Sequence, residues 1–478
     1  LRAIIQILFY TILSIAVKAQ LNNAFDSFEK QAFLAPASYS ICVLDARGEK
    51  VYAKYEQKLL MPASSQKVLT TASAFCLLGE NYQYNTQLAY SGAIANQKLN
   101  GDLFIIGSGD PTLGSKHFLN LQTPQSILTN WKDAIKNSGI NTINGNIIPD
   151  VSCFQENDVP QTWLWEDIGN YYGAAATGLN FMDNEYELSF NEDRKMGEAC
   201  SIINASGLEK HYEFYNEVEV GKEGSGDNAY LFGGPFEKGR FVKGMIPAGN
   251  KIFSIRGAIP YPPYHTSFQL NYLLANSGIV AQYHETPYPR IAIPPVYKVI
   301  HQIASPKLSE IIQITNHKSI NFYAEAILKT IGKEKGDEGS TEAGVKTIID
   351  YWKTKGLNLS NAYIKDGCGL SRVNAISTLH LATLMNLMSK HEKFELFYKT
   401  LPVAGFDGTL SKVCDGEPCK GKIIAKSGTM ERVVAYTGYV QSATKGLLSF
   451  SIIINNFDAR PSAVKAALTP IFNAMAAM

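Results

Sequence analysis

Pro62-Ala63-Ser64-Ser65-Gln66-Lys67 opens a largely apolar run that continues to Leu78 and predicts a buried helix. A proline suits the first turn of a helix, where its missing N–H leaves no intrahelical bond unmade. Ser64 would lie on that turn, near the positive end of the helix dipole, and Lys67 would share its face. A hydroxyl within reach of an amine is the pair that a serine acyl-transferase uses when lysine is the base. The stretch therefore predicts a nucleophile, Ser64, and its base, Lys67; the alternative is a helix cap without chemistry.

Two further short motifs follow along the chain. Ser319-Ile320-Asn321 precedes the amphipathic helical pattern 322–329, so both polar side chains would lie at the start of that helix. Lys426-Ser427-Gly428-Thr429 precedes the strand-like run 433–440, and its glycine would let a substrate backbone approach the strand edge. Each motif alone has a structural alternative: a helix cap for the first, and a solvated lysine on an edge strand for the second. The three motifs in this order favour catalysis.

The three motifs together resemble those of the D-alanyl-D-alanine carboxypeptidase/endopeptidase family of low-molecular-mass penicillin-binding proteins. The resemblance is to the class C branch, which carries a large insertion inside the catalytic domain. It runs from about Leu34 to the C-terminus and includes the stretches 101–113, 366–372 and 401–410. The chain departs from the family at two positions, with Ser427 where threonine is commoner and with Cys368 where serine is usual.

The resemblance implies a role for each catalytic residue. Ser64 would attack the carbonyl carbon of the penultimate D-Ala while an uncharged Lys67 takes its proton, and both burial and the nearby Lys426 should lower the pKa of Lys67. Ser319 would relay a proton to the departing D-Ala, and Asn321 would hold the peptide amide. The acyl-enzyme would then be hydrolysed by water, whereas a β-lactam would deacylate slowly and remain bound.

The resemblance also implies a substrate-binding set. Lys426, acting as a permanent cation, would bind the terminal carboxylate together with the hydroxyls of Ser427 and Thr429. The backbone N–H groups of Ser64 and Thr429 would form the oxyanion hole. The remaining predicted substrate-binding residues near these motifs are Gly428, Leu370 and Arg372.

The gap between Ser64 and Ser319 is larger than a whole small domain, which indicates an insertion. We expect a catalytic domain formed by 20–85 and 291–478, with inserted and mainly β domains at 86–290. The expected fold class is α+β: a penicillin-binding-protein/serine β-lactamase-like domain, in which helices cover an antiparallel sheet, carrying these insertions.

An aromatic and acidic patch in the insertion contains three residues predicted to bind substrate. Trp163, Glu166 and Tyr171 resemble a stretch that helps form the family's pocket for the side-chain amine of the peptide. A carboxylate beside aromatic rings suits an ammonium group, such as that of a diaminopimelyl residue. The alternative is an aromatic core segment with solvated acids.

The N-terminus and the composition set the compartment and limit the partners. Residues 1–19 combine Arg2, an apolar stretch and a small-residue site, which predicts a signal peptide cleaved before about Gln20, a periplasmic protein and no stable membrane anchor. With 44 Lys and Arg against 43 Asp and Glu, there is no basic excess for nucleic acid. No metal or other cofactor is expected. Among seven cysteines, Cys414 and Cys419 are close enough to close a small loop.

The sequence thus predicts a serine-type D-Ala-D-Ala carboxypeptidase that acts on peptidoglycan stem peptides and binds β-lactams, with DD-endopeptidase activity left open. Two alternatives remain. One is a β-lactamase or esterase-like hydrolase that shares Ser64 and Lys67, and the other is an inactive peptidoglycan-binding scaffold.

Overall fold

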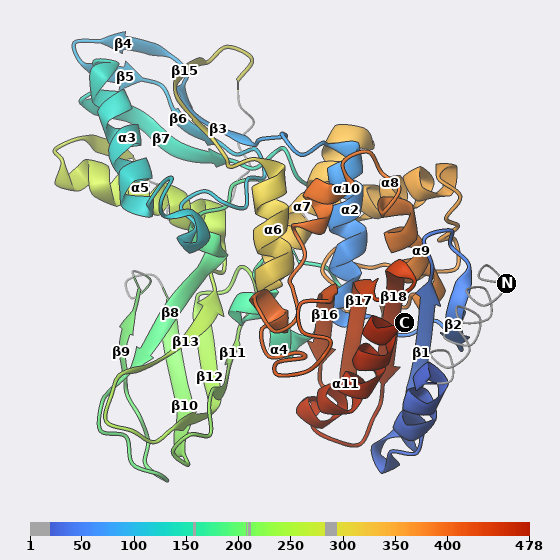
Figure 1. The fold of residues 1–478 in the computed structure, drawn as a ribbon. Helices are drawn as coiled ribbons and strands as arrows, with labels where there is room; N and C mark the ends of the chain where they lie inside the picture. Colours follow the sequence, from blue (N-terminus) through green and yellow to red (C-terminus); the bar gives the residue numbers. More distant parts are fainter. Residues whose placement is uncertain (1–19, 156–158, 207, 209–211, 283–293) are drawn as a thin grey trace, which may run out of the picture. The chain divides into compact units, whose positions relative to one another are not determined.

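The computed structural model describes residues 20–155, 159–206, 208, 212–282 and 294–478 (Figure 1). The predicted signal peptide, 1–19, lies outside the described residues. The chain divides into two compact units. The first combines the N-terminal part through Asn81 with Leu308–Ile331 and Gly344–Met478, and the second contains Tyr82–Lys307 and Gly332–Ala343. The second unit is therefore wider than the predicted insertion, 86–290, and takes in the last turn of one helix and the start of the next.

The first unit is built on a five-stranded antiparallel sheet in the order β16-β17-β18-β1-β2. Its strands are rich in isoleucine, valine and tyrosine, which suit a pleated surface that is buried on both faces. In the central register, Ile452 of β18 lies opposite Tyr436 of β17 and Ile41 of β1. The strands are β1 (Ser38–Leu44), β2 (Lys50–Lys54), β16 (Ile423–Met430), β17 (Val433–Ser442) and β18 (Gly446–Asn455).

Helices cover both faces of this sheet. The C-terminal helix α11 lies across one face, where Leu468 and Phe472 join a core with Phe450 of β18 (Figure 1). On the other face Ala382 of α9 packs against Cys42 of β1. Each fully buried leucine or phenylalanine contributes about 1.5–3 kcal/mol to folding. The helices of this unit, some of which run into the second, are α2 (Lys67–Leu77), α6 (Leu308–Lys318), α7 (Asn321–Lys335), α8 (Thr341–Thr354), α9 (Thr378–Met388), α10 (Phe394–Tyr398) and α11 (Pro461–Ala477), with η1 (Ala32–Leu34), η2 (Ala63–Gln66) and η6 (Gly408–Leu410) as 3-10 turns.

The second unit contains a mixed sheet with two helices packed on it. Trp131 of α3 and Leu270 of α5 are fully buried in one core with Leu103 of β6. The strands run in the order β15-β3-β6-β7-β5-β4, and β14 pairs with β7. The elements are β3 (Asn85–Tyr90), β4 (Ala93–Ala95), β5 (Lys98–Asn100), β6 (Leu103–Ile106), η3 (Lys116–Phe118), α3 (Pro124–Asn137), β7 (Thr142–Asp150), α5 (Pro262–Asn276), β14 (Val280–Gln282) and β15 (Lys298–Ala304).

Two three-stranded sheets complete the second unit. Their orders are β10-β12-β11 and β13-β8-β9, and Leu231, Val242, Leu188 and Ile255 from the two sheets share one core. The elements are α4 (Trp165–Ile168), η4 (Tyr171–Gly173), η5 (Met182–Asn184), β8 (Glu185–Phe190), β9 (Ile202–Ala205), β10 (Glu213–Gly221), β11 (Asn228–Phe232), β12 (Gly239–Pro247) and β13 (Phe253–Ala258).

The predicted fold class is confirmed, with a helix-covered antiparallel sheet and a mainly β insertion. Cys414 and Cys419 form a disulfide, as their spacing suggested. Across the described part of the chain, no helix combines the length and the apolar character needed to cross a membrane.

Candidate active site

Ser64 lies in the short turn η2 that leads directly into α2. The preceding residue, Ala63, has a φ of +47°, a left-handed conformation that is rare outside glycine, so this turn is strained. The hydroxyl of Ser65 donates to the carbonyl oxygen of Pro62 at 2.7 Å and fixes the turn from within. Ser64 itself is half-buried, which leaves its hydroxyl open to a substrate.

Lys67, three residues after Ser64, is the first residue of α2 and is fully buried. Its Nζ lies 2.9 Å from Ser64 Oγ, 2.7 Å from Asn321 Oδ1 and 2.8 Å from the carbonyl oxygen of Cys368. The last two atoms are acceptors only, so they take two N–H groups of the amine. The hydroxyl of Ser64 is the one partner that can donate. An uncharged Lys67 would therefore turn its lone pair toward the Ser64 proton.

Burial is the main influence on the pKa of Lys67 and lowers it from its ordinary value. Acidic neighbours oppose this shift by favouring the charged amine; they are Cys368, Asp366 and Glu325. Burial was one of the two causes expected from the sequence. The pKa of Lys67 is thus set by two opposing effects, desolvation and a group of acidic side chains that the motifs did not reveal.

Ser319 and Asn321 lie where helix α6 ends and helix α7 begins. Ser319 occupies the linking turn with a φ of +60°, a strained conformation for a residue other than glycine. This turn brings the Ser319 hydroxyl to 2.8 Å from Nζ of Lys426, while Asn321, the first residue of α7, contacts Lys67. The two polar side chains of the second motif therefore contact different lysines, Ser319 contacting Lys426 and Asn321 contacting Lys67.

Lys426 lies in β16 and is fully buried. Its Nζ contacts Ser319 Oγ and the carbonyl oxygen of Ser427, each at 2.8 Å. Burial lowers the pKa of Lys426 well below its ordinary value, and the charges of Lys67 and Lys465 lower it further. This direction works against the permanent cation expected from the sequence, which stays a prediction. Among the residues that the structure describes, no carboxylate contacts Lys426, and the arrival of a substrate carboxylate would raise the pKa of this amine.

The glycine of the third motif is required by packing. A Cβ on Gly428 would lie 2.6 Å from the carbonyl oxygen of Pro62 and 3.0 Å from the backbone nitrogen of Ser64. Strand β16 therefore runs directly against the turn that carries the nucleophile. Thr429, the next residue, is exposed. Because Gly428 lies against Ser64, the backbone N–H groups of Thr429 and Ser64 are carried by adjoining segments.

The other predicted binding residues of the first unit have different surroundings. Ser427 is buried and its hydroxyl donates to Thr409 Oγ1 at 2.8 Å, a partner in η6 that the sequence did not single out. Leu370 is half-buried. Arg372 is exposed, and its guanidinium lies 3.9 Å from the carboxylate of Glu431, at the turn between β16 and β17.

The loop 366–374 supplies the carbonyl oxygen of Cys368 that accepts a hydrogen bond from Lys67. The sequence motifs did not predict this role. The Asp366 carboxylate accepts hydrogen bonds from Gly369 N at 2.8 Å, Ser371 N at 2.6 Å and Asn374 Nδ2 at 2.8 Å. Gln66 Nε2 donates to the Asp366 backbone oxygen at 2.7 Å, which ties the loop to the residue before Lys67. These contacts hold the Cys368 carbonyl group in place as an acceptor for Lys67.

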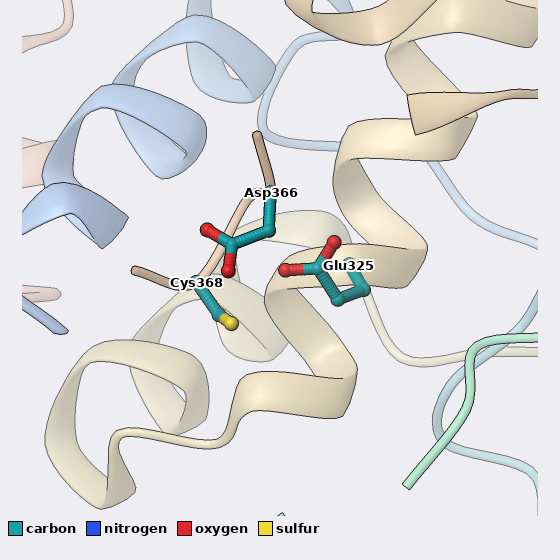
Figure 2. A group of neighbouring side chains, drawn as sticks. All are labelled: Glu325, Asp366 and Cys368. Carbon is teal, nitrogen blue, oxygen red and sulfur yellow. The ribbon is translucent and has the colours of Figure 1, made fainter. Parts of the chain in front are cut away.

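Glu325, Asp366 and Cys368 form a buried acidic group in which one ligand-type atom from each lies within 4.8 Å of the others (Figure 2). The Asp366 oxygens already accept several N–H donors, and the amine of Lys329 adds positive charge nearby. A cation would have to displace those donors against this charge, so we assign no metal to this group.

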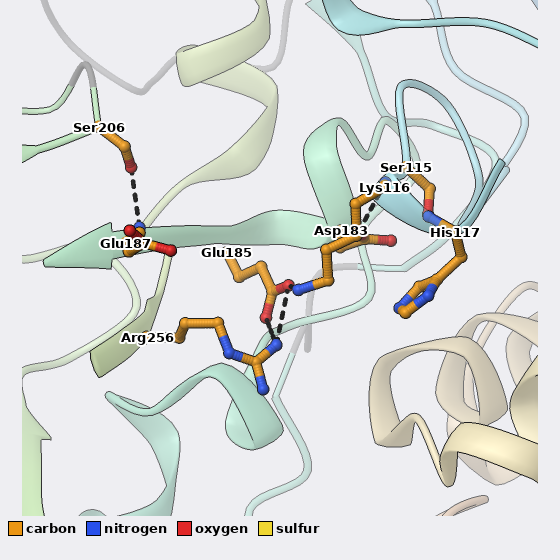
Figure 3. Close-up of polar contacts among 8 residues, drawn as sticks. All are labelled: Ser115, Lys116, His117, Asp183, Glu185, Glu187, Ser206 and Arg256. Atoms are coloured by element: carbon orange, nitrogen blue, oxygen red, sulfur yellow. Dashed lines mark hydrogen bonds and ion pairs between the residues drawn. The ribbon is translucent and has the colours of Figure 1, made fainter. Parts of the chain in front are cut away.

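The aromatic and acidic patch of the insertion lies in the second unit. Trp163 is buried, whereas Glu166 and Tyr171 are exposed. The guanidinium of Arg256 stacks 3.7 Å from the centre of the Tyr171 ring. It also donates to both carboxylate oxygens of Glu185, at 3.0 and 3.2 Å (Figure 3). Of the three predicted residues, two are therefore available to solvent and one packs inside.

Comparison with known proteins identifies the chain's relatives. Residues 21–475 match the D-Ala-D-Ala carboxypeptidase 3 (S13) family. A D-alanyl-D-alanine carboxypeptidase of Actinomadura sp. (strain R39) is 26% identical over 451 residues, covering 91% of this chain and 81% of that protein. The D-alanyl-D-alanine carboxypeptidase DacB of Haemophilus influenzae is 23% identical, covering 83% and 81%.

The fold of the chain is also that of a solved relative. The crystal structure of penicillin-binding protein 4 from Haemophilus influenzae superposes with a TM-score of 0.79 at 21% identity, covering 94% of this chain and 98% of that one. A structure of the same protein with a β-lactam gives a TM-score of 0.76. The family resemblance inferred from the motifs is confirmed. The chain belongs to the D-Ala-D-Ala carboxypeptidase 3 (S13) family.

Proposed function

We propose that Ser64 is the acyl acceptor of a serine-type D-Ala-D-Ala carboxypeptidase that trims peptidoglycan stem peptides. The family assignment fixes the class of enzyme. The role of Ser64 is supported by the 2.9 Å contact between Ser64 Oγ and Lys67 Nζ. The other two contacts of this amine are with hydrogen-bond acceptors. That arrangement suits an uncharged amine that receives the hydroxyl proton.

Acylation would begin when Ser64 Oγ attacks the carbonyl carbon of the penultimate D-Ala and Lys67 takes its proton. The backbone N–H groups of Ser64 and Thr429 would stabilise the oxyanion that forms. The C–N bond then breaks, and the departing D-Ala amine receives a proton through Ser319, which contacts Lys426 at 2.8 Å. Water hydrolyses the ester and restores Ser64.

The substrate carboxylate would bind Lys426 and the hydroxyl of Thr429. Ser427 has its hydroxyl on Thr409, so its part would be to hold the strand edge or to exchange this partner for the carboxylate. A β-lactam presents a similar carbonyl and carboxylate, and it would acylate Ser64 by the same route. The structural relative solved with a β-lactam supports this fold as a β-lactam binder.

The insertion would contribute recognition of the peptide side chain. Glu166 is exposed and follows the exposed Trp165 in the chain, and Tyr171 is also exposed. An acid beside aromatic rings suits an ammonium group, as on a diaminopimelyl residue. This part of the proposal rests on residue chemistry alone.

The protein would act in the periplasm after removal of residues 1–19. Its substrate class lies outside the cytoplasmic membrane, and the disulfide between Cys414 and Cys419 suits an oxidising compartment. N-terminal sequencing of the mature protein from a periplasmic fraction tests this. A mature chain that retains the leader, or one found with the cytoplasm, would contradict it.

One experiment tests the central proposal. The purified protein is incubated with a fluorescent penicillin, the labelled peptide is mapped, and D-Ala release from a pentapeptide is measured in parallel. We expect one label on Ser64 together with D-Ala release. Rapid penicillin turnover without D-Ala release would identify a β-lactamase or esterase, and neither labelling nor release would identify a binding scaffold. A cross-linked dimer peptide as substrate separates endopeptidase from carboxypeptidase activity.

A further inference from the structure

The face of α7 that carries Asn321 also carries Glu325 one turn later. Residues four apart lie above one another on a helix, so these two side chains point from one face of α7. Asn321 contacts Lys67 directly. Glu325 is buried, and its Oε1 accepts a hydrogen bond from the backbone N–H of Gly367 at 2.8 Å. One helix thus holds both the amide and the loop that contact Lys67.

The Gly367–Cys368 backbone is clamped between α2 and α7. The carbonyl oxygen of Gly367 accepts a hydrogen bond from Thr70 of α2 at 2.6 Å, and its N–H is held by Glu325 of α7. A Cβ on Gly367 would lie 2.8 Å from the carbonyl oxygen of Ala324, so the loop packs directly on α7. The next carbonyl oxygen, that of Cys368, is the one that accepts the Lys67 N–H.

The surroundings of Glu325 favour its uncharged form. Oε2 is buried and has no conventional hydrogen-bond partner among the described residues, an arrangement that is costly for a carboxylate. Burial, followed by the nearby Asp366, raises the pKa of Glu325 to about 8, against the opposing effects of the Gly367 N–H, the Cys368 thiol and Lys329. At neutral pH the side chain is therefore mostly a carboxylic acid.

The charge of Glu325 bears on Lys67 because a negative charge there raises the pKa of that amine. The titratable groups around Glu325 are Lys67 on α2, Asp366 and Cys368 on the loop, and Lys329 on its own helix. Moving one proton from Glu325 to Lys67 changes no net charge, but it converts an active base into an inactive ammonium group.

We infer that Glu325 is a positioning residue, which holds the Gly367–Cys368 backbone against Lys67 as an uncharged acid and thereby keeps Lys67 uncharged. This inference rests on the proposed role of Lys67 as the base. Glu325 does not touch the substrate. It acts by holding the Cys368 carbonyl group in place and, because its own side chain is uncharged, by not raising the pKa of Lys67.

Two substitutions separate the positioning contact from the charge. Glu325→Gln keeps an oxygen for the Gly367 N–H and is uncharged, as Glu325 is inferred to be. Acylation by penicillin should therefore persist, and the pH at which its rate rises should stay where it is in the unaltered protein. Glu325→Ala leaves that N–H without its partner, and its acylation should fall about tenfold or more at every pH. The matched control is Glu334→Gln, the same change at an exposed position of α7, which should leave the profile unchanged.

The measurement is the acylation rate against pH for the full chain and these variants, with thermal unfolding recorded for each. A Glu325→Gln profile whose rising limb lies at a lower pH than that of the unaltered protein would overturn the inference, because Glu325 would then be charged while Lys67 titrates. A Glu325→Gln enzyme as slow as Glu325→Ala at equal stability would also overturn it. Wild-type protein that penicillin does not label would contradict the proposed function instead.

An infrared titration of the unaltered protein gives a second readout, which needs neither activity nor a folded variant. A carboxylic-acid band should disappear with a midpoint near pH 8. If no carboxyl group titrates in that range, Glu325 is already ionised at neutral pH and the inference is wrong.

Discussion

Gly428→Ala should slow acylation without unfolding the protein. The added methyl group would lie 2.6 Å from the carbonyl oxygen of Pro62, 2.8 Å from Ser65 N and 3.0 Å from Ser64 N, all of them backbone atoms. To reach an ordinary contact of about 3.4 Å, β16 and the Ser64 turn must separate by about 0.8 Å at the tightest point. That movement pulls apart the two segments whose N–H groups are proposed to bind the oxyanion.

A misplacement of about 1 Å in a catalytic site lowers rates about 10²-fold, and loss of one oxyanion donor has an effect of similar size. We therefore expect the second-order acylation rate with a fluorescent penicillin to fall about 10²-fold. Overpacking should also reduce stability by about 1–3 kcal/mol. The matched control is Gly221→Ala in β10, where a Cβ meets nothing closer than 3.5 Å. A Gly428→Ala enzyme that acylates within about twofold of the unaltered protein would refute the proposed fit between β16 and Ser64.

Three further predictions concern the residues that act directly. Ser64→Ala should abolish covalent penicillin labelling while the thermal unfolding curve stays cooperative, and label remaining on the variant would remove Ser64 as the nucleophile. Lys67→Arg should stop acylation at every accessible pH because arginine stays protonated. Lys426→Arg should retain measurable acylation, whereas Lys426→Ala should lose far more of it. Acylation rates measured against pH check both expectations, and an active Lys67→Arg enzyme would contradict the role of Lys67 as the base. Glu166→Gln should weaken turnover of peptides with a free side-chain amine by about 1–3 kcal/mol and leave penicillin acylation nearly unchanged; equal losses on both substrates would show that the patch is structural.

The pH dependence of acylation follows from the direction of the shift on Lys67. The amine must be uncharged to take the Ser64 proton, so the rate should rise with pH through the pKa of Lys67 in the free enzyme. Burial lowers that pKa below its ordinary value, which moves the rising limb toward neutral pH. Glu325→Gln should leave this limb in place, because Glu325 is inferred to be uncharged while Lys67 titrates.

The sequence predicted the parts of the fold that depend on local pattern. The strand-like run predicted at 433–440 lies within β17, and the three short motifs located the segments that carry the polar groups. Helix α3 was missed within a segment interpreted as mainly β, although Thr123 and Pro124 offered a signal. The Thr123 side chain accepts from Ser126 N, and the proline occupies the first turn.

The support behind Lys67 could not be predicted in the same way. Asp366 and Glu325 matter because segments far apart in the chain pack together, so that a loop carbonyl meets an amine from α2. A buried acid has no sequence signature that separates it from a solvated one. Its proton affinity is set by desolvation, which only the packed structure reveals.

The two lysines show how similar burial can serve opposite tasks. Each amine is fully buried, and burial lowers the pKa of both. Lys67 has two acceptor-only contacts and one hydroxyl that can donate, so its free lone pair is directed at Ser64. Lys426 contacts a hydroxyl and the carbonyl oxygen of its own strand neighbour, and no carboxylate contacts it in the described chain. A substrate carboxylate would supply a negative charge next to Lys426 and would favour the charged form of this amine. That positive charge would in turn disfavour protonation of Lys67, which couples recognition of the carboxylate to activation of the base.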